Sequence, residues 1–95
     1  MIDRNTIEFI QTCRSCPEQY DAMYEGEIVG HLQLRWDTFW VFYPDVYGQV
    51  IYTKSVPSGL DGFETEEDRQ EQLGHARRAI ARRIEQAQSG QPDAS

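Results

Sequence analysis

The middle of the chain, residues 24–54, alternates between apolar and polar positions with a period of two. From Ile28 onward every second residue falls on one side of the backbone, which is typical of a strand with one buried face. Two more apolar runs, residues 39–43 and 49–54, follow after short polar connections. Gly26 can supply the positive φ that a tight hairpin needs. The pattern therefore predicts a meander of three antiparallel strands. One side of the first strand holds Ile28, Gly30, Leu32, Leu34 and Trp36.

Two segments nearer the N-terminus extend this pattern. Residues 18–25 alternate in the same way and predict a further strand. Residues 6–12 alternate more weakly, so the sequence leaves open whether an N-terminal edge strand joins the sheet. Pro17 separates the two segments, because proline cannot donate to a strand ladder. We expect three to four strands in all.

A long helix is predicted at residues 66–88. Thr65 followed by Asp68 resembles an N-terminal cap, and the acidic first turn complements the positive end of the helix dipole. Apolar residues then recur at spacings of three and four, which is typical of a helix that packs on a sheet. We expect Phe63, just before the helix, to pack onto the core. The apolar stripe consists of Leu73, Ala76, Ile80, Ile84 and Ala87.

These elements predict an α+β fold, in which an antiparallel β-meander of three to four strands packs on one C-terminal helix. A chain of 95 residues is long enough for one domain, which we place at residues 1–88. Residues 89–95 are polar and contain glycine and proline, and this composition predicts a disordered tail.

The charge balance and the absence of targeting patterns narrow the function classes. Sixteen acidic and nine basic residues give a net charge of −7, which disfavours attraction to nucleic-acid phosphates. No apolar run reaches the length of a membrane span, and the N-terminus lacks the pattern of a signal peptide. Two cysteines are too few for a disulfide scaffold. We therefore expect a cytoplasmic protein that does not contact a membrane.

The cysteine pair is the only motif with a chemical precedent. Cys13 and Cys16 have the spacing of two zinc ligands, but a structural zinc site needs two more. His31 and His75 do not have a spacing that would bring them to the cysteines. We predict no metal and no cofactor, with a zinc-stabilised module as the weaker alternative. No nucleophile with its base, phosphate-binding glycine loop or dinucleotide fingerprint is present, so we predict that the protein is not an enzyme.

The strands hold more aromatic rings than one helix can cover, because a single helix covers one face of a sheet. Rings that remain on the other face suit a protein interface. We therefore predict a small, acidic, non-enzymatic interaction protein that binds a protein partner or itself as a homodimer. Two arginines on the outer side of the helix would suit an acidic partner. The predicted partner-binding residues are Trp36, Trp40, Phe42, Tyr43, Arg78 and Arg82.

The alternative is a nucleic-acid-binding domain that uses the sheet or the helix arginines. A three-stranded sheet followed by a helix is similar in architecture to domains that read DNA with a sheet. The strands, however, offer only Arg35 and Lys54 as cations, beside five acidic residues. This charge balance places nucleic-acid binding below protein binding.

Three motifs carry a resemblance to a known group of proteins. They are CPEQYD at residues 16–21, GxxVGxLxLR at residues 26–35 and FxV at residues 39–41. In these motifs the chain resembles small uncharacterised proteins of actinobacteria and their phages, over residues 16–87. The chain departs from them at Trp36-Asp37, where many have glycine after the arginine. The resemblance implies a phage or mobile-element origin, and it carries no activity and no site residues.

Overall fold

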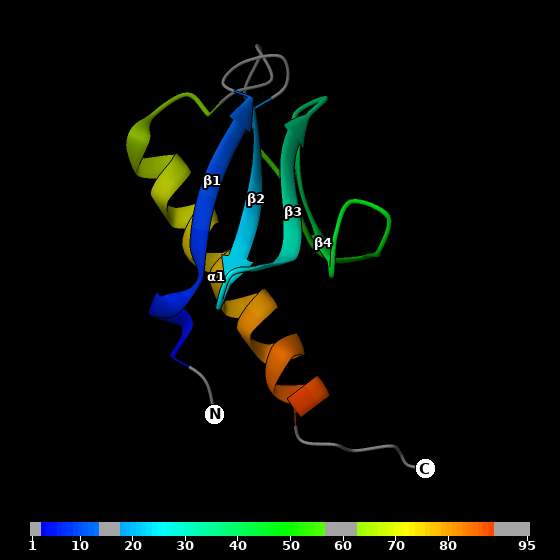
Figure 1. Ribbon diagram of the computed structural model, residues 1–95. Coiled ribbons are helices and arrows are strands. Elements are labelled where there is room, and N and C mark those ends of the chain that lie inside the picture. Colours follow the sequence, from blue (N-terminus) through cyan, green and yellow to red (C-terminus); the bar gives the residue numbers. More distant parts are fainter. Residues whose placement is uncertain (1–2, 14–17, 57–62, 89–95) are drawn as a thin grey trace.

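The computed structural model describes residues 3–13, 18–56 and 63–88. They form a five-stranded antiparallel sheet with one long helix packed on it (Figure 1). The predicted α+β class is confirmed, with five strands in place of three to four because residues 8–13 pair with the next strand. The predicted tail, residues 89–95, lies outside the described residues. The elements are η1 (Arg4–Thr6), β1 (Glu8–Cys13), β2 (Glu18–Tyr24), β3 (Glu27–Arg35), β4 (Thr38–Tyr43), β5 (Gln49–Ser55) and α1 (Glu66–Gln88).

Two tight turns connect the central strands, and both have positive φ at their two middle residues. Glu25 and Gly26 have φ of 52° and 82°, and Trp36 and Asp37 have φ of 54° and 57°. Positive φ at both positions is typical of the hairpin turn that matches the right-handed twist of the strands. The conformation is ordinary for glycine and rare for a bulky residue. Trp36 therefore holds a strained backbone position at the tip of the β3–β4 hairpin.

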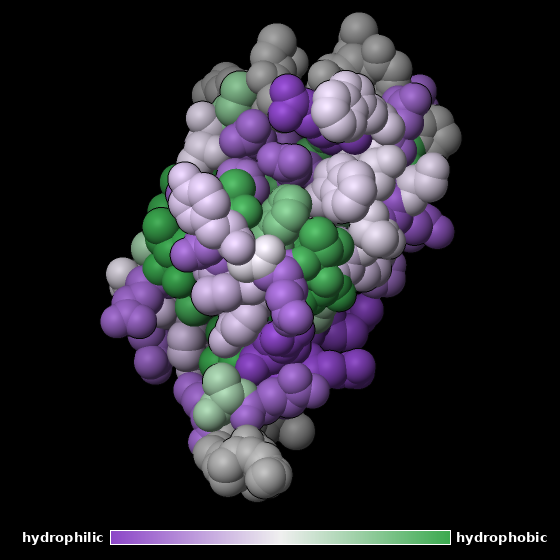
Figure 2. Space-filling model, turned by 90° about the vertical axis from the view of Figure 1, so that its right-hand side faces the viewer, coloured by the Kyte–Doolittle hydropathy of each residue, from purple (hydrophilic) through white to green (hydrophobic). Residues whose placement is uncertain are grey.

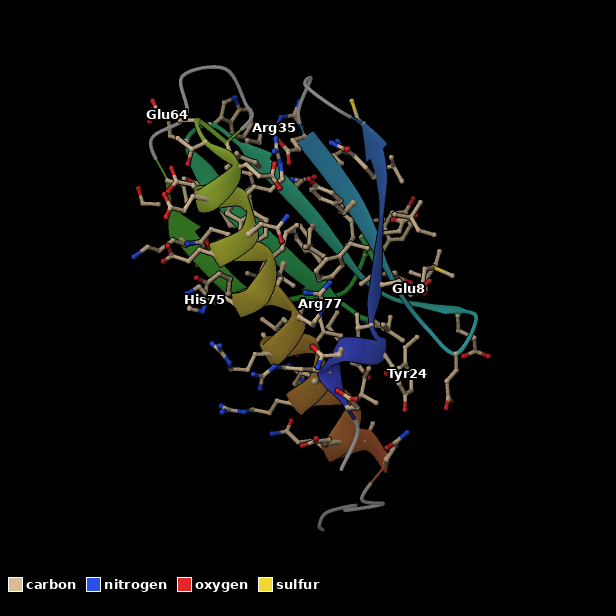
Figure 3. All side chains as sticks on the ribbon, turned by 90° about the vertical axis from the view of Figure 1, so that its left-hand side faces the viewer. Glu8, Tyr24, Arg35, Glu64, His75 and Arg77 are labelled. Carbon is tan, nitrogen blue, oxygen red and sulfur yellow. The ribbon has the colours of Figure 1, made fainter. Side chains whose placement is uncertain are left out.

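The hydrophobic core lies between the sheet and α1, on the side that we call the covered face. The strand register places Tyr20, Leu32 and Val41 side by side across the three central strands, and all three are buried. The helix crosses this face, as Figure 3 shows from the helix side. It lies close to the sheet at Gly30, where a Cβ atom would come within 2.9 Å of the Ile80 side chain. On the three central strands, the covered face includes Glu18, Tyr20, Ala22, Gly30, Leu32, Leu34, Phe39 and Val41.

The alternation predicted for β3 holds along most of the strand and fails at both of its ends. A β-bulge between Ala22 and Met23 adds a residue to β3, so Ile28 pairs with Met23 and is 51% exposed. Because one extra residue reverses the side on which the following residues lie, Ile28 does not share a face with Leu32. Trp36 also leaves that face, because it belongs to the turn.

The predicted start of α1 is confirmed in its hydrogen bonds. The Asp68 backbone N–H donates to Thr65 Oγ1 at 3.0 Å, so Thr65 caps the helix. The apolar stripe is buried from Leu73 to Ile84, whereas Ala87 in the last turn is exposed. Phe63 is buried against Phe39, with ring centroids 5.5 Å apart, as expected.

Candidate functional site

The side of the sheet that faces away from α1 is the candidate site, and we call it the open face. No helix or strand among the described residues packs on it. In Figure 2, which shows this side, hydrophobic side chains lie across the middle, between hydrophilic borders. The strand register assigns the following residues to the open face: Glu8, Ile10, Gln19, Asp21, Met23, Ile28, His31, Gln33, Arg35, Thr38, Trp40, Phe42, Val50 and Thr53.

One row of the open face crosses all five strands. Consecutive pairings join Ile10 to Asp21, Asp21 to His31, His31 to Phe42 and Phe42 to Val50. Ile10 and Val50 are exposed at the two ends of this row, and Phe42 is half-buried. Side chains opposite one another on neighbouring strands are in contact distance. The row is therefore a continuous, mainly apolar strip with one polar pair in its middle.

The polar pair consists of Asp21 and His31. His31 Nδ1 lies 3.3 Å from Asp21 Oδ1, and the His31 ring lies 6.2 Å from the Phe42 ring. His31 is only 8% exposed, because its neighbours on β2 and β4 enclose it. A buried imidazole needs a polar partner, and Asp21 supplies one. The pair thereby fixes the position of the ring beside Phe42.

Trp40 occupies the next row of the open face. It pairs with Gln33 on β3 and Thr53 on β5, and it is half-buried. Trp40 and Phe42 are two residues apart on one strand, so their rings point to the same side. Two large rings held by a sheet offer rigid apolar area that water still reaches.

The structure separates the six predicted partner-binding residues into four places. Trp40 and Phe42 lie together on the open face, as described above. Trp36 lies at the hairpin tip next to this face and is 76% exposed, with the Arg35 guanidinium 4.9 Å from its ring. The grouping of Tyr43 with these rings is wrong. Tyr43 alternates with Phe42, packs against the core, and has the Arg83 guanidinium of α1 5.2 Å from its ring.

Arg78 and Arg82 occupy the fourth place. Both lie on the exposed side of α1, which is on the other side of the sheet from the open face. Arg78 Nη1 lies 3.0 Å from His75 Nδ1. The structure therefore does not bring the helix arginines and the aromatic rings into one site.

A buried ionic network that the sequence did not reveal ties β2 to the start of α1. Glu18 is 1% exposed, and its carboxylate accepts hydrogen bonds from Arg69 Nε at 2.8 Å and Arg69 Nη2 at 3.2 Å. The Tyr20 hydroxyl also donates to Glu18, and the Phe63 backbone N–H donates at 3.4 Å. The only sequence signal was that Glu18 shares the alternation of Tyr20 and therefore points into the core.

The network shifts the pKa of its members in the directions that burial and pairing require. Burial by itself raises the pKa of Glu18, but the hydrogen bonds from Arg69, Tyr20 and Phe63 outweigh it and lower the pKa. Burial and the neighbouring carboxylate raise the pKa of Tyr20. Both oxygens of the Glu18 carboxylate are paired, and Glu18, Tyr20 and Arg69 line neither of the two hollows described for residues 3–13, 18–56 and 63–88. We assign it to fold stability.

The described residues supply no further ligands for the zinc-stabilised module considered as the weaker alternative. No group of three or more His, Cys, Asp or Glu side chains within residues 3–13, 18–56 and 63–88 could hold a metal ion. Cys13 is half-buried at the end of β1, and Cys16 lies outside the described residues. In the same part of the chain, no helix combines the length and apolarity needed to cross a membrane.

Comparisons with known proteins add no family. No protein-family model, no curated protein and no solved structure matches this chain.

Proposed function

We propose that this chain is a small, acidic, non-enzymatic interaction protein that binds a protein partner, or a second copy of itself, through the open face. The observation that carries the proposal is the mainly apolar row from Ile10 to Val50, which crosses five strands, has the Asp21–His31 pair in its middle, and is not covered by any described helix or strand. The sequence resemblance described above adds a phage or mobile-element origin to the proposal.

The two rings in the middle of the open face, Trp40 and Phe42, are suited to contribute much of the binding energy. Large aromatic side chains contribute much of the binding energy at protein interfaces, because they bury a large area and lose little conformational freedom. Trp40 and Phe42 are already held by their cross-strand neighbours Gln33 and His31, which lowers the entropy lost on binding. A partner that covers them would remove their remaining exposed area from water.

The charge of the open face also suits a protein partner. The chain carries −7 overall, but the charged residues of the open face are Glu8, Asp21 and Arg35, which nearly balance. The interior of a protein interface is depleted in charge relative to the rest of the surface. The open face is therefore a nearly neutral region on an acidic protein.

The test compares open-face variants with a matched aromatic control. Trp40→Ala and Phe42→Ala remove rings from the open face, whereas Tyr47→Ala removes a ring that is 93% exposed in the β4–β5 connection. Light scattering over a range of concentrations reports self-association, and quantitative capture from cells of the source organism with mass spectrometry reports other partners. We expect a discrete complex that Tyr47→Ala retains and that both open-face variants lose. Equal binding by all three variants would refute the proposal.

A further inference from the structure

A hollow of about 430 Å³ lies on the helix side of the molecule, where η1 packs against the second half of α1. Figure 3 shows η1 beside the helix on this side, opposite to the side seen in Figure 2. The volume is within the range of small-molecule sites. Its lining includes Arg4 from η1 together with Arg78 and Arg82 from α1.

These three arginines differ from the other arginines among the described residues. Each of the others is engaged by a specific group of the protein: Arg35 by the Trp36 ring, Arg69 by Glu18 and Glu66, Arg77 by the Ile7 carbonyl and the Phe9 ring, and Arg83 by Gln49 and the Tyr43 ring. The contacts of Arg69, Arg77 and Arg83 join α1 to the N-terminal segment and the sheet. Among the described residues, no hydrogen bond, ion pair or ring contact of an arginine of the hollow joins α1 to the sheet, and Arg78 contacts His75 on its own helix.

Three arginines and two carboxylates, Asp3 and Glu85, line the hollow, so the formal charge of its lining is +1. Within residues 3–13, 18–56 and 63–88, no carboxylate lies within ion-pair distance of Arg4, Arg78 or Arg82. Asp3 borders the hollow, but its Oδ1 accepts the Asn5 backbone N–H at 2.9 Å and caps η1. Glu85 also borders it and has an interaction of its own.

The hydrogen bond of Arg78 to His75 does not cancel the positive charge of the guanidinium. Arg78 Nη1 is 3.0 Å from His75 Nδ1, and a neutral imidazole accepts this hydrogen bond without cancelling the positive charge. With three arginines against Asp3 and Glu85, the lining of the hollow carries a small excess of positive charge on a chain of net charge −7. A local patch of this kind attracts anions even when the whole molecule repels them.

We infer that the hollow between η1 and α1 binds a phosphate-class oxyanion, either inorganic phosphate or a phosphate monoester. Three arginines from two elements line the hollow, and the planar guanidinium fork matches the oxygens of a phosphate bidentately. A phosphate dianion balances several cations better than a single carboxylate does. Asn5 adds a polar side chain to the same wall. This site is independent of the open face, so either proposal can fail alone.

The experiment is isothermal titration calorimetry of inorganic phosphate into the full chain at low ionic strength, with chloride at matched ionic strength as the blank. We expect saturable binding to one site, and a loss of affinity of about tenfold or more in Arg78→Ala and in Arg82→Ala, since each removes a charge-assisted contact. Arg35→Ala, at the far hairpin tip, is the matched control and should bind as the wild type does. Circular dichroism melts of the variants check that these exposed substitutions leave the fold intact.

Separate arms distinguish the source of the phosphate. Phosphoserine tests a monoester, and a single-stranded oligonucleotide tests a nucleic-acid backbone. Saturable phosphate or phosphoserine binding that the two helix variants lose supports the inference. Heat that does not saturate, or affinity that is the same in Arg78→Ala, Arg82→Ala and the wild type, overturns it. Binding of the oligonucleotide alone, with a steep salt dependence, overturns it in favour of nucleic-acid recognition.

Discussion

The covered face and the open face are two sides of the same five strands, and they differ in what lies on them. On β4, Phe39 and Val41 are fully buried beneath α1, whereas Trp40 and Phe42, which alternate with them, remain half-exposed. Both faces are rich in apolar and aromatic residues, so the difference does not come from composition. It comes from α1, the one long helix among the described residues, which covers one face of the sheet.

Charged residues on the two faces also differ in their surroundings. The covered face includes a buried carboxylate, Glu18, with every oxygen paired, while the open face carries its charges near water. A buried charge contributes to stability only while its partners are present. An exposed charge has little influence on stability and can take part in recognition. The two faces should therefore respond differently to the same kinds of substitution.

The largest expected effect is on the buried network. Arg69→Ala leaves the Glu18 carboxylate buried without its main partner, and we expect the free energy of unfolding to fall by about 3–5 kcal/mol. Arg35→Ala on the open face is the control, with an expected change within about 0.5 kcal/mol. Urea denaturation monitored by tryptophan fluorescence measures both. Similar values for the two variants would show that the network does not stabilise the fold.

Two apolar substitutions, one on each face, test how much each face contributes to stability. Leu32→Ala opens a cavity beneath α1 and should lower the free energy of unfolding by about 3 kcal/mol. Phe42→Ala removes a larger side chain from the open face, yet we expect a loss of only about 1 kcal/mol, because water already reaches that ring. Thermal or urea unfolding gives the two values. If Phe42→Ala were the more destabilising variant, the two faces would not differ in the way described here.

The pH dependence of stability gives a smaller and more specific signal. The pKa of Glu18 is lower in the folded chain than its ordinary value of 4.5, because the hydrogen bonds from Arg69, Tyr20 and Phe63 outweigh burial. The contribution of this group is therefore fully present above the unfolded pKa and is lost as the pH falls through the folded pKa. We expect the melting temperature of the wild type to fall more steeply than that of Glu18→Gln between about pH 5 and about pH 3. Parallel curves would show that Glu18 does not have a lowered pKa.

The smallest effect concerns the strained hairpin tip. Trp36 has φ of 54°, a conformation that costs a residue with a side chain about 1–2 kcal/mol and costs glycine almost nothing. We expect Trp36→Gly to leave the free energy of unfolding unchanged or to raise it by up to about 1 kcal/mol, since the contact with Arg35 is lost at the same time. A strongly destabilised variant would mean that the tryptophan supports the turn. In that case its exposure would not be a sign of a role in binding.

Part of the candidate site could be predicted from the sequence. The alternation along β4 predicted that Trp40 and Phe42 share one side, and the surplus of rings predicted that one side of the sheet would stay uncovered. Tyr43 could not be assigned correctly, because the alternation gives two sets of residues without saying which set α1 covers. The hollow could not be predicted at all, since Arg4 lies more than seventy residues before Arg78 in the chain.

The sequence by itself determined the elements whose signals are local. The apolar spacing and the Thr65 cap defined α1 as residues 66–88, and the period of two defined the strands. These signals depend on neighbours within a few residues, which any conformation of the chain keeps close. Only the tertiary structure decided which face of the sheet α1 covers. It also decided that the bulge places Ile28 on the opposite face from Leu32 and that Glu18 pairs with Arg69. Those outcomes depend on packing between segments far apart in the chain, and local periodicity contains no information about such contacts.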